Sequence, residues 1–144
     1  MNDSIEFLRA YFMYAFPYAP ILDRCDFLMR YRRQQHSSFV MQALLSYGAS
    51  FVDDHFIHRA GYTTHQEARE TFYSRASLLY SFDCEKNQLD LLQGCLLLGF
   101  SYISPRRNKD YRYWFSNALR IATNMGMHQR YKSTLLSRVK ELRY

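Results

Sequence analysis

The side chains of this 144-residue chain that are best suited to chemistry are five histidines and three cysteines. His55 and His58 are three positions apart and follow Asp53 and Asp54, so one helix end could bring two imidazoles and a carboxylate together. Zinc needs a further protein ligand in matching geometry, and the spacing indicates none. We therefore interpret the pair as a solvated helix end and predict no metal-binding, cofactor-binding or DNA-contacting residue. The other histidines are His36, His65 and His128.

The cysteines are equally isolated. Cys25, Cys84 and Cys95 form an odd set without a C-x-x-C pair, which argues against a disulfide framework and against a zinc site. We interpret them as free thiols in a reducing compartment. The chain also lacks a nucleophile elbow, a P-loop, a dinucleotide fingerprint and an H-E-x-x-H motif. The prediction is that the protein is not an enzyme and has no catalytic residue.

The composition indicates one globular domain over residues 1–144. Hydrophobic residues make up 48% of the chain, which is too many for a disordered tail, and 5 Gly and 3 Pro are too few for a collagen-like chain. Aromatic residues are abundant, with 1 Trp, 13 Tyr and 11 Phe. Most are expected in the core, and a minority could line a cavity between helices. The tyrosines expected on or beside buried faces are Tyr47, Tyr73, Tyr102 and Tyr113.

The chain carries 19 Lys and Arg against 13 Asp and Glu, a net charge of +6. Three segments carry most of the excess: 30–33, 106–109 and 130–143. We place them at helix ends, in turns and on solvated faces, where basic side chains offset the helix macrodipole. A DNA-reading helix would concentrate them on one exposed stripe, which is not apparent here.

The chain shows no sign of secretion or of membrane insertion. Its first six residues include Asp3 and Glu6 where a signal peptide would carry positive charge. The most continuous apolar stretch, 89–103, contains Asp90 and Gln93 and is shorter than the roughly 20 apolar residues that a bilayer span needs. We expect an intracellular protein and a buried helix at this stretch.

Apolar residues recur with helical spacing along the whole chain, which predicts an all-α fold of about seven helices packed as hairpins in an irregular array. Thr64-His65-Gln66-Glu67 matches a capping box, in which Thr accepts from the Glu amide and the Glu side chain returns to the Thr amide. Gly126 is the expected left-handed residue after the sixth helix. The helices are expected after an N-cap at Ser4 as far as Pro17, after Asp23, over 38–54, after Thr64, over 88–103, over 109–125, and from Ser133 onward.

A faint internal repeat supports two tandem hairpins, over about residues 38–80 and 88–125. Phe72-Tyr73-Ser74-Arg75-Ala76 and Trp114-Phe115-Ser116-Asn117-Ala118 share the order aromatic, aromatic, Ser, any residue, Ala. Small residues at matching places, Ala43, Gly94, Ala76 and Ala118, would let partner helices approach closely. Coincidence in an all-helical chain is the alternative, because a repeat array normally needs three or more units.

Ordered motifs cover nearly the whole chain, at segments 11–12, 16–22, 27–31, 41–49, 67–69, 72–80, 91–98, 114 and 118–128. Together, in this order, they resemble the fungal-specific transcription factor domain, or middle homology region, of zinc-cluster transcription factors. The subgroup that the chain most resembles is that of the cutinase transcription factors. The resemblance implies a nuclear, all-α regulatory domain that responds to a protein partner or a small-molecule effector, whereas a separate six-cysteine zinc cluster reads DNA.

The chain departs from the family pattern in two ways. It has no six-cysteine cluster, and it ends at Tyr144, where the family continues into further helices. We therefore expect a partial domain that is truncated at its C-terminus and self-associates through a last helix whose apolar side is exposed. A free-standing helical adaptor or a vestigial fragment that binds a protein partner is the alternative. The apolar residues of that helix are Leu135, Leu136, Val139 and Leu142.

Overall fold

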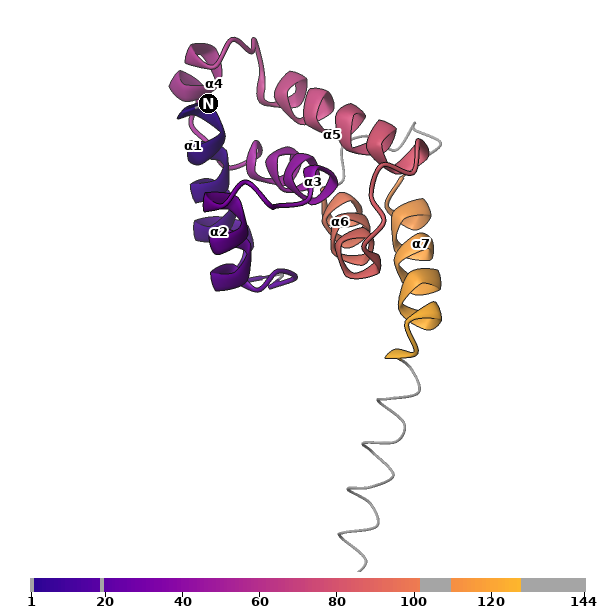
Figure 1. The fold of residues 1–144 in the computed structure, drawn as a ribbon. Helices are drawn as coiled ribbons and strands as arrows, with labels where there is room; N and C mark the ends of the chain where they lie inside the picture. The colour runs from indigo at the N-terminus through magenta and orange to yellow at the C-terminus, as the bar shows by residue number, and fades with distance from the viewer. Residues whose placement is uncertain (1, 19, 102–109, 128–144) are drawn as a thin grey trace, which may run out of the picture.

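The computed structural model describes residues 2–18, 20–101 and 110–127, and the secondary structure in these ranges is entirely helical (Figure 1). The predicted all-α fold is confirmed. No helix in the described ranges is long and apolar enough to cross a membrane. The elements are α1 (Asn2–Ala10), the π-helical turn η1 (Tyr11–Ala15), α2 (Arg24–Arg32), α3 (Ser38–Gly48), α4 (Asp54–Arg59), α5 (His65–Ser81), α6 (Gln88–Phe100) and α7 (Tyr111–Asn124).

Polar side chains begin most of these helices, as the sequence predicts. Asp23 accepts a hydrogen bond from the Asp26 amide at 3.0 Å, and Asn87 caps α6 in the same way. Thr64 accepts from the Glu67 amide at 3.1 Å, which confirms the first half of the capping box. The second half differs, because the Glu67 carboxylate accepts from the amide of Thr63 at 2.7 Å.

Two sequence-based helix boundaries are wrong. Ser4 does not cap the first helix, because α1 already begins at Asn2. The helix expected over 38–54 ends at Gly48, and a separate short helix, α4, follows. The cause is Asp53, whose carboxylate accepts from the Phe56 amide at 2.7 Å. A cap of this kind needs an extended backbone, here with φ −75° and ψ 162°, which a continuous helix excludes.

The first helix buries most of the apolar stripe that its spacing predicts, because Leu8, Phe12 and Ala15 are buried. It differs at Ile5, which is 44% exposed, and at Phe7 and Tyr11, which also reach the core. The π-helical turn η1 follows, so the phase of the apolar stripe changes within one continuous helical segment. Spacings of three and four residues do not predict this change.

Helix α3 lies at the centre of the fold and packs against α1, α5 and α6, while α7 packs on the outer side of α6 (Figure 1). The two predicted hairpins are thus present as the pairs α3 with α5 and α6 with α7. Gly126 has the expected positive φ of 75° at the end of α7. The helix predicted from Ser133, the basic segments 106–109 and 130–143, His128 and Tyr102 lie outside the described residues.

Glycines set the distance between α6 and its two neighbours. A Cβ atom on Gly94 would lie 2.1 Å from the ring of Phe39 in α3, and one on Gly99 would lie 2.5 Å from the ring of Phe115 in α7. Gly94 therefore serves the contact with α3 and not, as the repeat suggests, the contact within its own hairpin. Ala43 of α3 and Ala76 of α5 are fully buried, and these two helices pack against each other.

An aromatic cluster joins α5 to α7. The Trp114 side chain is 0% exposed, and its indole N–H donates to the Tyr73 hydroxyl at 2.7 Å. Tyr80 meets the Trp114 ring edge to face at a centroid distance of 5.3 Å, and its hydroxyl accepts from Arg120 at 3.1 Å. Tyr73 is the buried core residue that the sequence predicts, whereas Tyr47 and Tyr113 are half-buried.

We predict that Gly94→Ala destabilises the fold although alanine is the better helix former. Overpacking against the buried ring of Phe39 costs about 1–3 kcal/mol, whereas the gain in helix propensity is at most about 1 kcal/mol. Urea unfolding followed by circular dichroism measures the difference. The control Ser74→Ala lies on an exposed side of α5 and should leave the midpoint nearly unchanged. An unchanged midpoint for Gly94→Ala would contradict the close contact.

Candidate functional site

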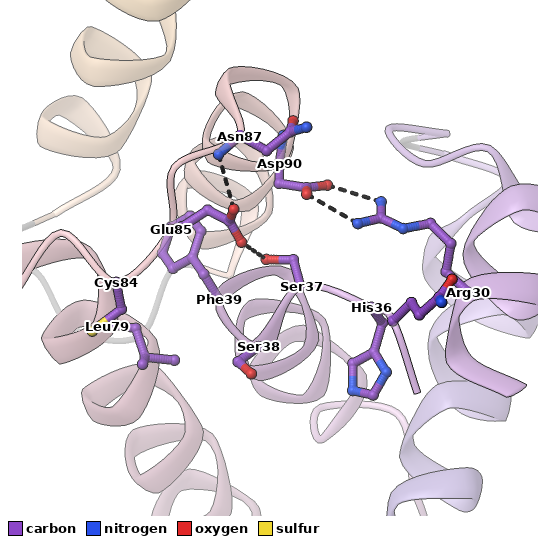
Figure 2. A pocket seen from close by; sticks show the side chains of 11 residues that line it. Arg30, His36, Ser37, Ser38, Phe39, Leu79, Cys84, Glu85, Asn87 and Asp90 are labelled. Carbon is purple, nitrogen blue, oxygen red and sulfur yellow. Dashed lines mark hydrogen bonds and ion pairs between the residues drawn. The ribbon is translucent and has the colours of Figure 1, made fainter. Parts of the chain in front are cut away.

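A polar pocket of about 450 Å³ lies where the end of α2, the start of α3, the end of α5 and the start of α6 meet (Figure 2). Its walls come from segments that are far apart in the sequence. Arg30 and His36 line one side, while Leu79, Cys84 and Glu85 line the other. The pocket therefore lies at a junction of four helices, and its polar side chains show which contacts hold these helices together.

The strongest polar contact at this junction joins Arg30 of α2 to Asp90 of α6. Two parallel hydrogen bonds of 3.1 Å link the guanidinium to both carboxylate oxygens. The Asp90 side chain is 5% exposed and that of Arg30 is 33% exposed. The hydrogen bonds to Asp90 raise the pKa of Arg30. A bidentate pair of this kind fixes orientation as well as distance.

A second polar contact joins the start of α3 to the loop before α6. The Ser37 hydroxyl donates to the Glu85 carboxylate, and its oxygen accepts from the Val40 amide at 3.2 Å. The other Glu85 oxygen accepts from the Asn87 amide at 3.0 Å, as Figure 2 shows. The carboxylates of Glu85 and Asp90 are thus both used by partners inside the chain.

The remaining groups of the pocket do not form a catalytic set. Burial, with a smaller effect of the nearby Arg30 charge, lowers the pKa of His36, which favours the neutral ring at pH 7. Its Nδ1 is buried and has no hydrogen-bond partner among the described residues. The ring packs against Tyr31, with 5.3 Å between centroids. Within the described contacts, no hydrogen bond links His36 to Ser37, Ser38 or Cys84 as a base to a nucleophile.

The predicted histidine pair is arranged differently from the sequence expectation. His55 and His58 lie on α4 and not at a fraying end of α3. Asp54 instead pairs with His65, whose Nδ1 lies 3.2 Å from the carboxylate, and the other ring nitrogen lies 2.6 Å from the carbonyl of Val52. Among the described residues, no group of three His, Cys, Asp or Glu side chains could hold a metal ion.

A second hollow lies between α1 with η1 on one side and α2 on the other. We call it the α1/α2 groove; its volume is about 660 Å³. No pattern in the sequence predicts it, because its lining residues come from two helices that each also turn apolar residues to the core. Its edge is marked by the exposed Ile5 and Met13, and exposure of this kind is seen only in the structure. The lining residues are Ile5, Leu8, Arg9, Phe12, Met13, Arg24, Leu28, Tyr31 and Arg32.

The described residues of the two hollows do not form an active site. Comparison with known proteins shows the family to which the chain belongs. The fungal specific transcription factor domain matches residues 8–143, almost the whole of the framework described above. The chain belongs to this family. The cutinase-factor resemblance is confirmed by the relatives, and the family and its members found here are transcription factors, not enzymes.

Three relatives show the extent of the similarity. The fusaric acid cluster transcription factor FUB12 of Gibberella fujikuroi is 34% identical over 85% of this chain and 18% of its own length. Cutinase transcription factor 1 beta of Fusarium vanettenii is 34% identical over 93% of the chain and 16% of its own length. The acetamidase regulatory protein of Aspergillus fumigatus is 31% identical over 86% of this chain and 16% of its own length. The chain thus matches less than a fifth of these relatives. No solved structure matches.

We predict that Arg30→Ala destabilises this family domain by about 1–3 kcal/mol, because it leaves the buried Asp90 carboxylate without its partner. The loss of unfolding free energy should be smaller than for a fully buried ion pair, because Arg30 is one-third exposed. Chemical unfolding measures the loss. The control Arg33→Ala removes an exposed arginine one turn away and should have little effect. Equal effects of the two substitutions would contradict a structural role for the pair.

The three cysteines should react at very different rates. Burial raises the pKa of Cys95 to about 12, whereas Cys25 and Cys84 are exposed. Because the thiolate is the nucleophile, iodoacetamide at neutral pH should modify Cys25 and Cys84 and spare Cys95 until the protein is denatured. Peptide mass spectrometry measures the labelling. Modification of Cys95 as fast as Cys25 in the folded protein would contradict the burial.

Proposed function

We propose that the chain is the regulatory region of a zinc-cluster-type transcription factor, and that it modulates DNA-templated transcription in the nucleus through protein or small-molecule contacts. The observation that carries this proposal is the family match over residues 8–143. In this proposal zinc binding and DNA reading belong to other parts of the factor, and the chain binds no cofactor. The relatives support it, because their names describe transcription factors and a regulatory protein.

The basic run 30–33 does not form the exposed stripe that a DNA-reading helix needs. Arg30 is turned inward to Asp90. Arg32, two residues later, lines the α1/α2 groove. The run 30–33 is thus divided between two places and does not form one stripe along an exposed helix.

A free-standing helical adaptor is the second candidate. The observation behind it is the α1/α2 groove, because an adaptor needs a surface that binds a partner. A regulatory domain needs such a surface as well. The two candidates differ in whether the chain must be held at a promoter. Self-association through residues 133–144 belongs to either candidate and lies outside the described residues.

A reporter assay tests the proposal. We predict that inserting the chain between a heterologous DNA-binding domain and a constant activation segment changes reporter output several-fold relative to a flexible spacer of equal length. The control carries Trp114→Asp, which places an unpaired charge in the core and should unfold the chain. Equal output from the folded and unfolded versions would contradict a regulatory role. If the chain expressed without the DNA-binding domain changed reporter output as much as the inserted chain does, the chain would be an adaptor.

A further inference from the structure

We propose that the α1/α2 groove binds an acidic amphipathic helix of a partner protein. This inference rests on the proposed function, since a regulatory region acts through a partner, and it specifies the chemistry of that partner. The floor of the groove is apolar and includes Leu8, Phe12 and Leu28. Met13 at its edge is 58% exposed. A partner helix would therefore cover apolar surface that this chain leaves in contact with solvent.

The charged side chains of the groove are all of one sign. Arg9 lies on the α1 side, Arg24 and Arg32 lie on the α2 side, and none of the described lining residues is acidic. Arg9 also pairs with Glu6 at 3.4 Å, but that pair is exposed and such pairs contribute little. Arg24 lies over the Phe12 ring, 5.7 Å from its centroid, so its position relative to the floor is defined. The ligand that complements this lining is apolar on one side and carries carboxylates along its flanks.

The spacing of the arginines selects a helix over a single carboxylate. Arg24 and Arg32 are eight residues apart on α2, which corresponds to about 12 Å along the helix axis. One carboxylate reaches only one of them. A partner helix with acidic residues two turns apart can meet both while its i, i+3, i+4 and i+7 side chains enter the groove.

The wall opposite α2 has two features that suit a helical ligand. Phe12 and Met13 belong to the π-helical turn η1. Turns of this kind are rare and are frequent at functional sites. Methionine side chains are flexible and polarisable, so they adapt to the side chains of an incoming helix. The π-helical turn thus places an adaptable apolar side chain at the mouth of a positively charged groove.

Fluorescence polarisation with the full chain tests the proposal. The probe is a fluorescein-labelled helical peptide of about 16 residues with leucines at i, i+3, i+4 and i+7 and glutamates two turns apart on both flanks. Two matched peptides replace every glutamate by lysine or scramble the leucines. We expect saturable binding of the acidic peptide and at least about tenfold weaker binding of both matched peptides. Equal binding of the lysine peptide would overturn the proposal, as would no binding of the acidic one.

Charge reversal locates the site. The double variant Arg24→Glu/Arg32→Glu should weaken binding of the acidic peptide by about tenfold or more and restore binding of the lysine peptide. Arg59→Glu/Arg75→Glu is the matched control, because both are exposed arginines that lie over phenylalanine rings outside the groove. The control should bind the acidic peptide nearly as the unchanged chain does. Equal losses in the two double variants would mean a non-specific charge effect and would overturn the proposal.

Two further measurements separate this inference from the proposed function. If sodium laurate displaces the acidic peptide, and its own affinity depends on Arg24 or Arg32 alone, the groove takes a small amphiphile and the helix proposal fails. If Arg24→Glu/Arg32→Glu abolishes peptide binding but leaves the reporter effect intact, regulation is retained and the groove is not its partner site. Loss of both supports the helix as the regulatory partner. Circular dichroism of each variant confirms that the helical content is kept.

Discussion

Close packing around α3 is the constraint on which the other features depend. This helix packs against α1, α5 and α6, and two of its contacts leave no room for an additional methyl group. A Cβ atom on Gly48 would lie 2.4 Å from the carbonyl oxygen of Phe7, and one on Gly94 would meet the ring of Phe39. Because α3 and α6 touch at the Phe39 ring, the start of α3 lies close enough to the loop before α6 for the Ser37 hydroxyl to donate to the Glu85 carboxylate. The polar pocket follows from that apolar packing.

Local chemistry explains how much of the fold could be predicted from the sequence. Caps at Asp23, Thr64 and Asn87 act over three residues, so their patterns predict helix starts to within a residue or two. Asp53 caps α4 by the same rule, but it stands inside a run with helical spacing, so the spacing does not predict the split between α3 and α4. The π-helical turn η1 was missed because its apolar residues still recur at helical spacings.

The candidate sites were not predictable, because they depend on contacts between distant segments. Arg30 and Asp90 are 60 positions apart, and nothing in their local sequence distinguishes this arginine from Arg32 or Arg33. The motifs that resemble the family are of a different kind. Cys95, Leu98 and Trp114 lie in those motifs and are buried, so the resemblance reports the packing framework more directly than it reports a binding surface. It therefore predicted the fold and the family, and neither hollow.

The position of α2 links the two hollows physically. Phe27 is the buried residue of this helix, and the bidentate pair of Arg30 with Asp90 holds its C-terminal half to α6. On another side, Arg24 and Leu28 face the α1/α2 groove. Helices with few buried contacts are among the less stable parts of a fold. Displacing α2 would cost the burial of Phe27, the partial burial of Leu28 and Tyr31, and the ion pair of Arg30. A ligand that binds one arrangement of α2 more tightly than another would therefore change the stability of the Arg30–Asp90 pair. Because coupling between two sites is reciprocal, the strength of that pair would change the affinity for the ligand by the same factor.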